Sequence, residues 1–317
     1  MNRLLQTRAQ LTCRVQTQSL KQCSSTSTAT TPSKLPDHVL PLTCPSSAKS
    51  GFCEVYLIGT VHISQKSCAE VRALINFLRP EVVFLELCKS RQALLKDQKI
   101  PTAEEIVTAA WKKRSNVNIL GLLLSLIYAS IANEHKVIPG SEFRVAYEEA
   151  IKYGGRAVLG DRSVQVTLAR AWRKMPLQEK MRLFTCLFRK KSSRLSEVMS
   201  KLLEGRDVDI DMDMVSLIVQ EFGKMCPTLL ETIVHERDVY MSYALLQEAK
   251  KSSCIVAVVG MGHLRGIKKH WEQPILATQV KDLLKIPPPP KPAMSTIILA
   301  SVGVFVAGVS MVWGYLH

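Results

Sequence analysis

Two histidines of the chain stand in the same short motif, each directly after a β-type run. The run Val55 to Ile58 leads into Gly59-Thr60-Val61-His62, and the run Ile255 to Val259 leads into Gly260-Met261-Gly262-His263. Both motifs read G-x-x-H. A single histidine is more often a hydrogen-bonded structural residue than a ligand, but two imidazoles that meet in one cleft can bind a divalent metal ion.

A carboxylate follows another β-type run and would complete such a metal site. Glu86 comes directly after Val82 to Leu85. Because the carboxyl ends of parallel strands share one edge of an α/β sheet, we expect Glu86 to lie beside His62 and His263. A metal ion held by these three residues would lower the pKa of a bound water and polarise a carbonyl or phosphoryl oxygen. His and Glu ligands suit zinc, manganese or iron, so the residue types leave the metal open.

The remaining β-type run, Arg156 to Leu159, delivers Gly160-Asp161-Arg162 to the same edge. Arg162 would stabilise charge that develops on a substrate, and Asp161 would orient a ligand or accept a proton. The glycines at these strand ends would let the chain turn tightly and approach a ligand closely. The four strand ends together therefore predict one shared site.

A further set of charged residues, His235 to Asp238, lies inside a helix-type segment. Adjacent positions of a helix point to different faces, so these four side chains are not all expected at one site. For His235 and Asp238 we expect a salt-bridged helix surface. Glu236 and Arg237 stay open between a structural and a functional role.

The elements that must position these residues alternate along the chain. The four β-type runs are nearly continuous apolar segments, as expected of strands buried on both faces. Helix-type segments accompany them, chiefly Cys68 to Leu78, Glu142 to Tyr153, Leu177 to Phe188 and Thr228 to Lys250. This alternation predicts an α/β fold, a single domain over residues 51–286 with a largely parallel sheet and flanking helices.

The C-terminal segment has the composition of a membrane span. Ser295 to Leu316 contains no Asp, Glu, Lys or Arg, and about 20 apolar residues suffice to cross a bilayer. A proline-rich spacer, residues 287–294, precedes it. We therefore expect a transmembrane tail anchor over residues 295–316, with the α/β domain on the cytosolic side. Gly303 and Ala307 have the small-residue spacing that would let this helix form a homodimer.

Charge and cysteine content narrow the functional classes. The net charge is +15, but the basic residues are scattered without a recognition motif, so nucleic acid is not expected as a partner. They fit solvated faces or attraction to an anionic membrane surface. Nine cysteines without a C-x-x-C pair indicate free thiols in a reducing compartment. Residues 1–50 read as a targeting leader or a disordered tail, without the apolar core of a secretory signal.

Five motifs, in order between Glu54 and Lys285, resemble the TraB family, which is named for a bacterial pheromone-shutdown protein. The motifs are Gly59-Thr60-Val61-His62, Glu86-Leu87-Cys88 with Arg91, Gly160-Asp161-Arg162, Glu236-Arg237-Asp238 and Gly260-Met261-Gly262-His263. The resemblance implies a fold shared with the Tiki, erythromycin-esterase and haem-uptake ChaN-like proteins. Tiki-like relatives are regarded as metal-dependent proteases, and bacterial members limit a peptide pheromone.

The same resemblance implies roles for individual residues and a location. His62, Glu86 and His263 become the metal ligands. Glu86, Arg162 and Arg237 become the catalytic residues, the two arginines as substrate partners or as structural ion pairs. Eukaryotic members of this size are associated with the mitochondrial outer membrane, so we expect the domain there, facing the cytosol, with endoplasmic reticulum or plastid membranes as alternatives.

Three functions follow from these patterns. The first is a metal-dependent hydrolase of a peptide or another amide or ester, held at an organelle surface. The second is a non-enzymatic adaptor or tether at the mitochondrial outer membrane, which would recruit proteins of mitochondria-endoplasmic reticulum contacts. The third is a regulator that binds a peptide signal without cleaving it.

Overall fold

The computed structural model describes residues 36, 38–61, 65–96, 140–188 and 223–288, with the single positions 105, 108, 121, 125 and 220. His62, the expected leader over most of its length and the expected tail anchor lie outside these residues. Among the residues described, no helix is both long enough and apolar enough to cross a membrane.

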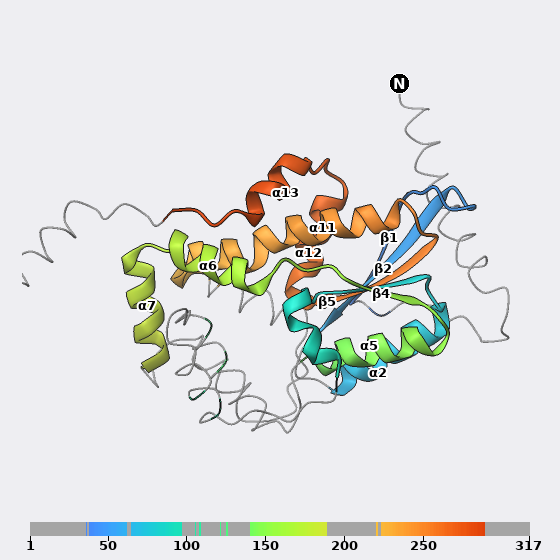
Figure 1. Ribbon diagram of the computed structural model, residues 1–317, viewed down its shortest axis with the longest axis horizontal. Helices are drawn as coiled ribbons and strands as arrows, with labels where there is room; N and C mark the ends of the chain where they lie inside the picture. The colour runs from blue at the N-terminus through green and yellow to red at the C-terminus, as the bar shows by residue number, and fades with distance from the viewer. Residues whose placement is uncertain are drawn as a thin grey trace, which may run out of the picture.

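A five-stranded sheet forms the centre of the domain, with strand order β1-β2-β5-β3-β4 (Figure 1). The strands are β1 (Val39–Pro45), β2 (Phe52–Thr60), β3 (Val82–Leu85), β4 (Arg156–Leu159) and β5 (Cys254–Gly260). Neighbouring strands run parallel except β1, which pairs antiparallel with β2. The predicted α/β class, the largely parallel sheet and the four predicted strands are thus confirmed.

The edge strand β1 was not expected from the sequence. Its side chains alternate between inward and outward positions, and two prolines, Pro41 and Pro45, interrupt the apolar pattern. Proline lacks the N–H group that a strand between two neighbours must donate, but an edge strand tolerates it. The strand therefore lacks the continuous apolar run that identifies the other four.

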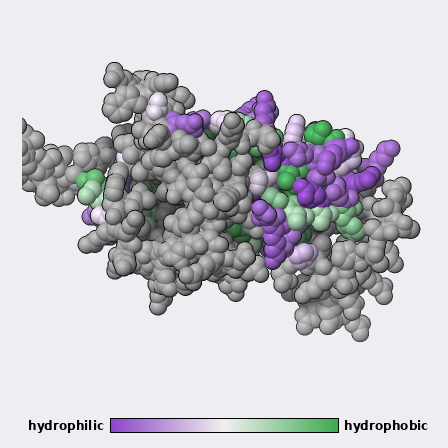
Figure 2. Space-filling view, turned by 90° about the horizontal axis from the view of Figure 1, so that it is seen from below, coloured by the Kyte–Doolittle hydropathy of each residue, from purple (hydrophilic) through white to green (hydrophobic). Residues whose placement is uncertain are grey.

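Helices cover both faces of the sheet. Figure 1 shows α2 and α5 on one face and α11, α12 and α13 on the other side. The helical elements are α2 (Gln65–Leu78), η1 (Lys89–Leu95), α5 (Ser141–Lys152), α6 (Val164–Lys174), α7 (Leu177–Phe188), α10 (Pro227–Leu230), η2 (Glu231–His235), α11 (Glu236–Ala249), η3 (Met261–His263), α12 (Leu264–Trp271) and α13 (Ala277–Leu284). Where Figure 2 shows described residues from the side of α2 and α5, hydrophilic side chains predominate, as expected of amphipathic helices.

The core consists of two apolar layers, one on each face of the sheet. Strand β5 contributes alternately to both: Val256 and Val258 pack toward α2 and α5, whereas Ile255, Ala257 and Val259 pack toward α11 and α12. A strand that is buried on both faces needs apolar residues at every position. This explains why β5 reads as a continuous apolar run.

Close packing explains the glycines that end two strands. A Cβ atom on Gly160 would lie 1.8 Å from Cζ of Phe84, and one on Gly59 would lie 2.5 Å from Cδ1 of Leu264. Neither glycine has a positive φ angle. These positions therefore need glycine because a neighbouring strand or helix packs against them. We had expected the glycines to permit tight turns beside a ligand instead.

The segment Thr228 to Lys250, expected as one helix, contains a change of helical type. The α-helical turn α10 passes into the π-helical segment η2, and α11 follows without a break. A π-helical segment widens the spiral and leaves backbone carbonyls available for other donors. The carbonyl oxygen of Thr232 accepts from Arg162, and that of Ile233 accepts from Arg237. The irregular segment is thereby tied to the charged residues around it.

Candidate functional site

Glu86 joins the ends of two parallel strands. Its side chain is buried, and its Oε2 atom accepts a hydrogen bond of 2.6 Å from the backbone N–H of Gly260, at the end of β5. Its own backbone N–H donates to the carbonyl oxygen of Val258. The strand ends therefore meet, as the sequence predicted, and Glu86 is fixed between them.

Arg237 lies between two carboxylates at this edge. Its Nη2 atom donates to Oε1 of Glu86 and, at 2.9 Å, to Oδ2 of Asp161, while Nε donates to Oδ1 of Asp161 at 3.0 Å. Burial would lower the pKa of Arg237, but the charges of Asp161 and Glu86 outweigh it and raise the pKa. The guanidinium is therefore a permanent cation at the centre of the site.

A second arginine completes the surroundings of Asp161. Arg91, from η1, donates to Oδ2 of Asp161 at 2.7 Å and to the carbonyl oxygen of Glu86 at 3.1 Å. The backbone N–H of Arg162 donates to Oδ1 of the same carboxylate at 2.7 Å. Because both oxygens of Asp161 are engaged, this residue holds the two arginines in place.

His263 brings an ionisable ring to the same group. Its Nδ1 atom lies 2.6 Å from Oδ1 of Asp238, and its Nε2 atom lies 3.3 Å from Oε1 of Glu86 and 3.2 Å from Nη1 of Arg237. An ionised carboxylate only accepts, so Nδ1 carries a proton that it donates to Asp238. The Nε2 atom can then either accept from Arg237 or, when protonated, donate to Glu86.

The charges around His263 determine its protonation. Burial alone would lower the pKa of His263, and Arg237 acts in the same direction. The charge of Glu86 and the hydrogen bonds to Asp238 and Glu86 outweigh them and raise the pKa to about 9. His263 is therefore mainly an imidazolium at neutral pH, with a proton on Nε2 directed at Glu86.

We call this group the strand-edge cluster: Glu86, Arg91, Asp161, Arg237, Asp238 and His263. It contains three carboxylates, two arginines and a protonated histidine, so its formal charges cancel. Groups of this kind can transfer a proton through Glu86 and His263 and can stabilise an anion through Arg237.

The cluster differs from the expected metal site in one respect. Within the residues described, which do not include His62, no three His, Cys, Asp or Glu side chains form a group that could hold a metal ion. The physical reason is Arg237, which contacts both Glu86 and His263 where an ion bound to these two residues would lie. As arranged, the described residues do not fit a divalent cation, because the guanidinium already supplies the positive charge.

Arg162 belongs to a different network. Its side chain is fully buried, with Nη1 donating to Oε2 of Glu236 at 2.7 Å and Nε donating to Thr167 at 3.1 Å. Arg170 and Lys174 donate to Glu236 as well. We call these four charged residues, Arg162, Arg170, Lys174 and Glu236, the Glu236 cluster. Arg162 therefore lies where a structural ion-pair partner would lie, which is one of the two roles expected for it.

The Glu236 cluster also binds backbone atoms near the end of α13. Arg162 donates to the carbonyl oxygen of Leu283 at 2.9 Å, and Arg170 donates to those of Asp282 and Lys285. Burial would raise the pKa of Glu236, but hydrogen bonds from Arg170, Lys174 and Arg162 lower it to about 2. Glu236 therefore stays ionised across the physiological range.

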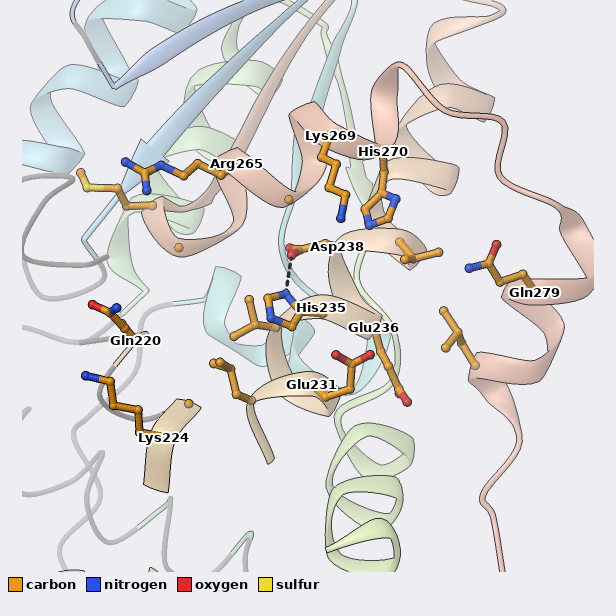
Figure 3. Close-up of a pocket in the computed structure, with 18 residues that line it drawn as sticks. Gln220, Lys224, Glu231, His235, Glu236, Asp238, Arg265, Lys269, His270 and Gln279 are labelled. Atoms are coloured by element: carbon orange, nitrogen blue, oxygen red, sulfur yellow. Dashed lines mark ion pairs between the residues drawn. The ribbon is translucent and has the colours of Figure 1, made fainter. Parts of the chain in front are cut away.

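The predicted helix surface holds for His235 and is wrong for Asp238. The His235 side chain is 52% exposed, and its Nδ1 atom lies 3.7 Å from Oδ2 of Asp238 (Figure 3). Asp238, on α11, is buried against His263 of η3 and Gly266 of α12. The side chains of this segment do point to different faces as expected: Glu236 contacts Arg162, and Asp238 contacts His263.

Sequence reasoning also missed a buried carboxylate on α5. Glu142 is fully buried, and its Oε1 atom lies 3.4 Å from the hydroxyl oxygen of Thr60, at the end of β2. Its helix buries Val145, Ala146 and Glu149 on the same side. Two glutamates seven positions apart on the apolar face of a helix, Glu142 and Glu149, were the available signal, because buried carboxylates need partners.

Comparison with known proteins gives consistent matches over this domain. Residues 47–274 match the model of the TraB/PrgY/gumN family. The chain is 32% identical over 276 residues to a "TraB domain-containing protein" of Homo sapiens, which covers 79% of this chain and 70% of that protein. The corresponding protein of Bos taurus is 32% identical over 261 residues, 74% of this chain and 66% of that protein.

An archaeal relative extends the comparison beyond animals. An uncharacterised protein of Methanocaldococcus jannaschii is 32% identical over 232 residues, which are 70% of this chain and 54% of that protein. The match thus spans about two thirds of the mammalian relatives and about half of the archaeal one.

Proposed function

This chain belongs to the TraB/PrgY/gumN family, and on that basis we propose that it is a hydrolase of amide or ester bonds whose reaction takes place at the strand-edge cluster. One observation carries the proposal: Nε2 of His263 and the carboxylate of Glu86 lie 3.3 Å apart beside the Arg237 guanidinium. Peptides are the proposed substrate class.

In the proposed reaction, Glu86 acts as general base. It removes a proton from a water molecule, whose oxygen attacks the carbonyl carbon of the substrate. The carbonyl oxygen gains negative charge, and Arg237 stabilises it electrostatically. The Arg237 side chain is 14% exposed, against 5% for Glu86, so its guanidinium is the more accessible of the two groups.

His263 is the proposed general acid. Its pKa of about 9 keeps a proton on Nε2 at neutral pH, and that proton passes to the leaving nitrogen or oxygen when the bond to carbon breaks. Asp238 holds the ring through Nδ1 and stabilises the imidazolium. Glu86 then passes the proton that it accepted to Nε2 of His263, and both residues return to their starting protonation states.

The metal-dependent form of the proposal assigns zinc, manganese or iron to His62, Glu86 and His263. A divalent ion bound by Glu86 and His263 would have to displace Arg237, so no step above passes through a metal. Metal analysis of purified full-length protein, wild type beside His62→Ala, separates the two forms. Equimolar metal that is lost in His62→Ala supports the metal-dependent form and contradicts the scheme above.

A specific observation favours a second function, a non-enzymatic adaptor. The charges of the strand-edge cluster cancel, and its members are hydrogen-bonded to one another, as in a purely structural network. In this alternative the domain recruits organelle-contact proteins or retains a peptide without cleaving it.

The proposed location is the mitochondrial outer membrane, with the domain facing the cytosol and residues 295–316 as the anchor. The absence of charged residues in Ser295 to Leu316 supports the anchor, and the organelle is proposed from the resemblance to eukaryotic family members alone. Protease treatment of intact organelles tests it, because a cytosolic domain is digested without detergent. Fractionation against endoplasmic reticulum and plastid markers tests the alternatives, and crosslinking of the wild type beside a Gly303→Leu variant tests the homodimer.

A peptide library with mass-spectrometric readout tests the hydrolase. Full-length wild-type protein should produce new peptide termini, and Glu86→Gln should not. Intact peptides with both proteins, together with normal organelle morphology in cells that carry Glu86→Gln, would contradict the hydrolase and support the adaptor.

A further inference from the structure

A pocket of about 1000 Å³ lies between η2, α11, α12 and α13, separate from the reacting groups proposed above (Figure 3). Asp238 is part of its wall, but Glu86, Arg237 and His263 are not. The pocket therefore meets the strand-edge cluster at a single carboxylate. Its volume is at the upper end of the range of small-molecule sites.

Basic side chains flank Asp238 in this pocket. Figure 3 shows Lys269 and His270, from α12, and His235, from η2, near the space beside Asp238. Burial lowers the pKa of His270, and although the charge of Asp238 raises it, the charges of Lys269 and His235 lower it further. These groups are thus close enough to repel one another, and the repulsion would be relieved by a bound anion.

The acidic side chains of the pocket are largely committed elsewhere. Glu236 accepts from three basic residues of its own cluster, and Asp238 is hydrogen-bonded to His263. Glu231 is the remaining carboxylate in the described wall, which contains Lys224 and Arg265 as further basic residues. The described pocket therefore has a positive balance.

The rest of the wall consists of apolar residues, glycines and two neutral polar residues, Gln220 and Gln279. Its apolar members are Leu230, Val234, Val239, Met261 and Leu283. Gly266 lets the carboxylate of Asp238 pack directly against α12, because a Cβ atom there would lie 2.0 Å from Oδ2 of Asp238. Apolar surface beside basic groups matches a ligand that has both an apolar chain and a negative charge.

We propose that this pocket binds a small amphipathic anion, an organic acid whose carboxylate contacts Lys269 and His235 and whose chain packs on the apolar wall. This site is distinct from the proposed hydrolytic site, and ligand binding there does not depend on the hydrolase proposal. Because His235 lies close to Asp238, the bound anion can affect the strand-edge cluster, of which Asp238 is a member.

The two oxygens of Asp238 face in different directions. Oδ1 accepts from His263 at 2.6 Å, whereas Oδ2 lies 3.7 Å from Nδ1 of His235. An anion bound to His235 competes with Asp238 for the same imidazole. A bound anion therefore changes the interaction of Asp238 with His235 and, through Asp238, the electrostatic environment of His263.

Isothermal titration calorimetry of full-length protein with octanoate tests the binding. Acetate supplies the carboxylate without the chain, and octanol supplies the chain without the charge, all at constant ionic strength. We expect octanoate to bind at least about tenfold more tightly than either control, because buried methylenes and a charge-assisted hydrogen bond each contribute. Octanol or acetate binding as tightly as octanoate would overturn the proposal.

Two neighbouring lysines provide a matched pair of variants. Lys269 lines the pocket, whereas Lys268, on the same helix, is exposed and is not part of the wall. Lys269→Glu should weaken octanoate binding about tenfold or more, and Lys268→Glu should change it less than about twofold. Equal effects of the two substitutions would show that general charge, not this pocket, attracts the ligand.

The imidazole signals of His263 in NMR spectra test the link to the strand-edge cluster. They can be assigned by their loss in His263→Gln. Saturating octanoate should shift these signals in the wild type, and the same concentration should leave them unchanged in Lys269→Glu. Signals that stay fixed in the saturated wild type would overturn the link.

Discussion

The strand-edge cluster and the Glu236 cluster each include one of two adjacent residues of α11, and their compositions suit different roles. In the first, three carboxylates face two arginines and one histidine at the ends of strands. In the second, one carboxylate receives three basic side chains, and the arginines also bind carbonyl oxygens of α13. Glu236 and Arg237 are neighbours in sequence and yet belong to separate networks.

The difference lies in whether a cluster contains a histidine. The strand-edge cluster contains His263, with a pKa of about 9, whereas Glu236 has a pKa of about 2 and its partners are Arg and Lys. A network of a strongly ionised carboxylate with Arg and Lys can hold a structure together but is poorly suited to proton transfer. Substitutions in the two clusters should therefore separate loss of activity from loss of stability.

The largest expected effect is on turnover in Glu86→Gln. Gln keeps the shape of the side chain but cannot accept a proton from water, so hydrolysis should fall between about a hundredfold and ten-thousandfold. The rate of product formation by full-length protein measures it. Glu248→Gln, which removes an exposed ion pair with Arg156, is the control and should retain wild-type turnover.

Glu236→Gln should have the opposite profile. Removal of this charge leaves Arg162 and Arg170 without their buried partner, so the free energy of unfolding should fall by about 3–5 kcal/mol. Chemical denaturation measures the loss, and turnover per folded molecule should change little. Comparable loss of turnover in Glu236→Gln and Glu86→Gln would remove the distinction between the clusters.

The pH dependence of stability should identify His263. Its pKa is raised on folding, from 6.5 to about 9, so its stabilising contribution is fully present below pH 6.5 and is lost as the pH rises through 9. Wild type should exceed His263→Gln by at most about 3 kcal/mol at pH 6, and the difference should vanish above pH 9. Denaturation at several pH values measures both, and a difference that grows with pH would refute the assignment.

Glu236 should give the opposite pH dependence. Its pKa is lowered on folding, from 4.5 to about 2, so the contribution is present above pH 4.5 and is lost as the pH falls through 2. The stability difference between wild type and Glu236→Gln should therefore be constant from pH 5 to 8 and shrink below pH 4.5. Acid denaturation curves of the two proteins provide the comparison.

The smallest effect is expected for His235→Ala. The His235 side chain is 52% exposed and lies 3.7 Å from Asp238, so its removal should lower the free energy of unfolding by less than about 1 kcal/mol. Thermal denaturation measures it. A loss as large as that of Glu236→Gln would mean that His235 belongs to the buried network rather than to the pocket surface.

The fold was most predictable where the sequence pattern reflects burial on both faces, as in β2, β3 and β5. The edge strand β4 was recognised from its short apolar run, but the edge strand β1 escaped because its two prolines interrupt such a run. The helical segment α12 also went unpredicted because His263 and Gly262 before it were interpreted only as a motif.

The site was predictable as far as strand order determines it. Glu86, Asp161 and His263 follow parallel strands, and their side chains are joined by Arg237, which was left open. The directions of Arg162 and Asp238 depend on contacts with α6, η2 and η3 that sequence spacing does not specify. Their partners therefore became visible only in three dimensions.

The contacts of α13 determine how mechanical force would enter the domain. If residues 295–316 are fixed in a membrane as proposed, a pull on the tail passes along the chain to α13, whose carbonyl oxygens are held by Arg162 and Arg170. Glu236, on α11 and next to Arg237, forms ion pairs with both arginines and therefore resists this pull. Tension on the anchor would therefore strain α11, which carries Arg237, before it loaded the sheet.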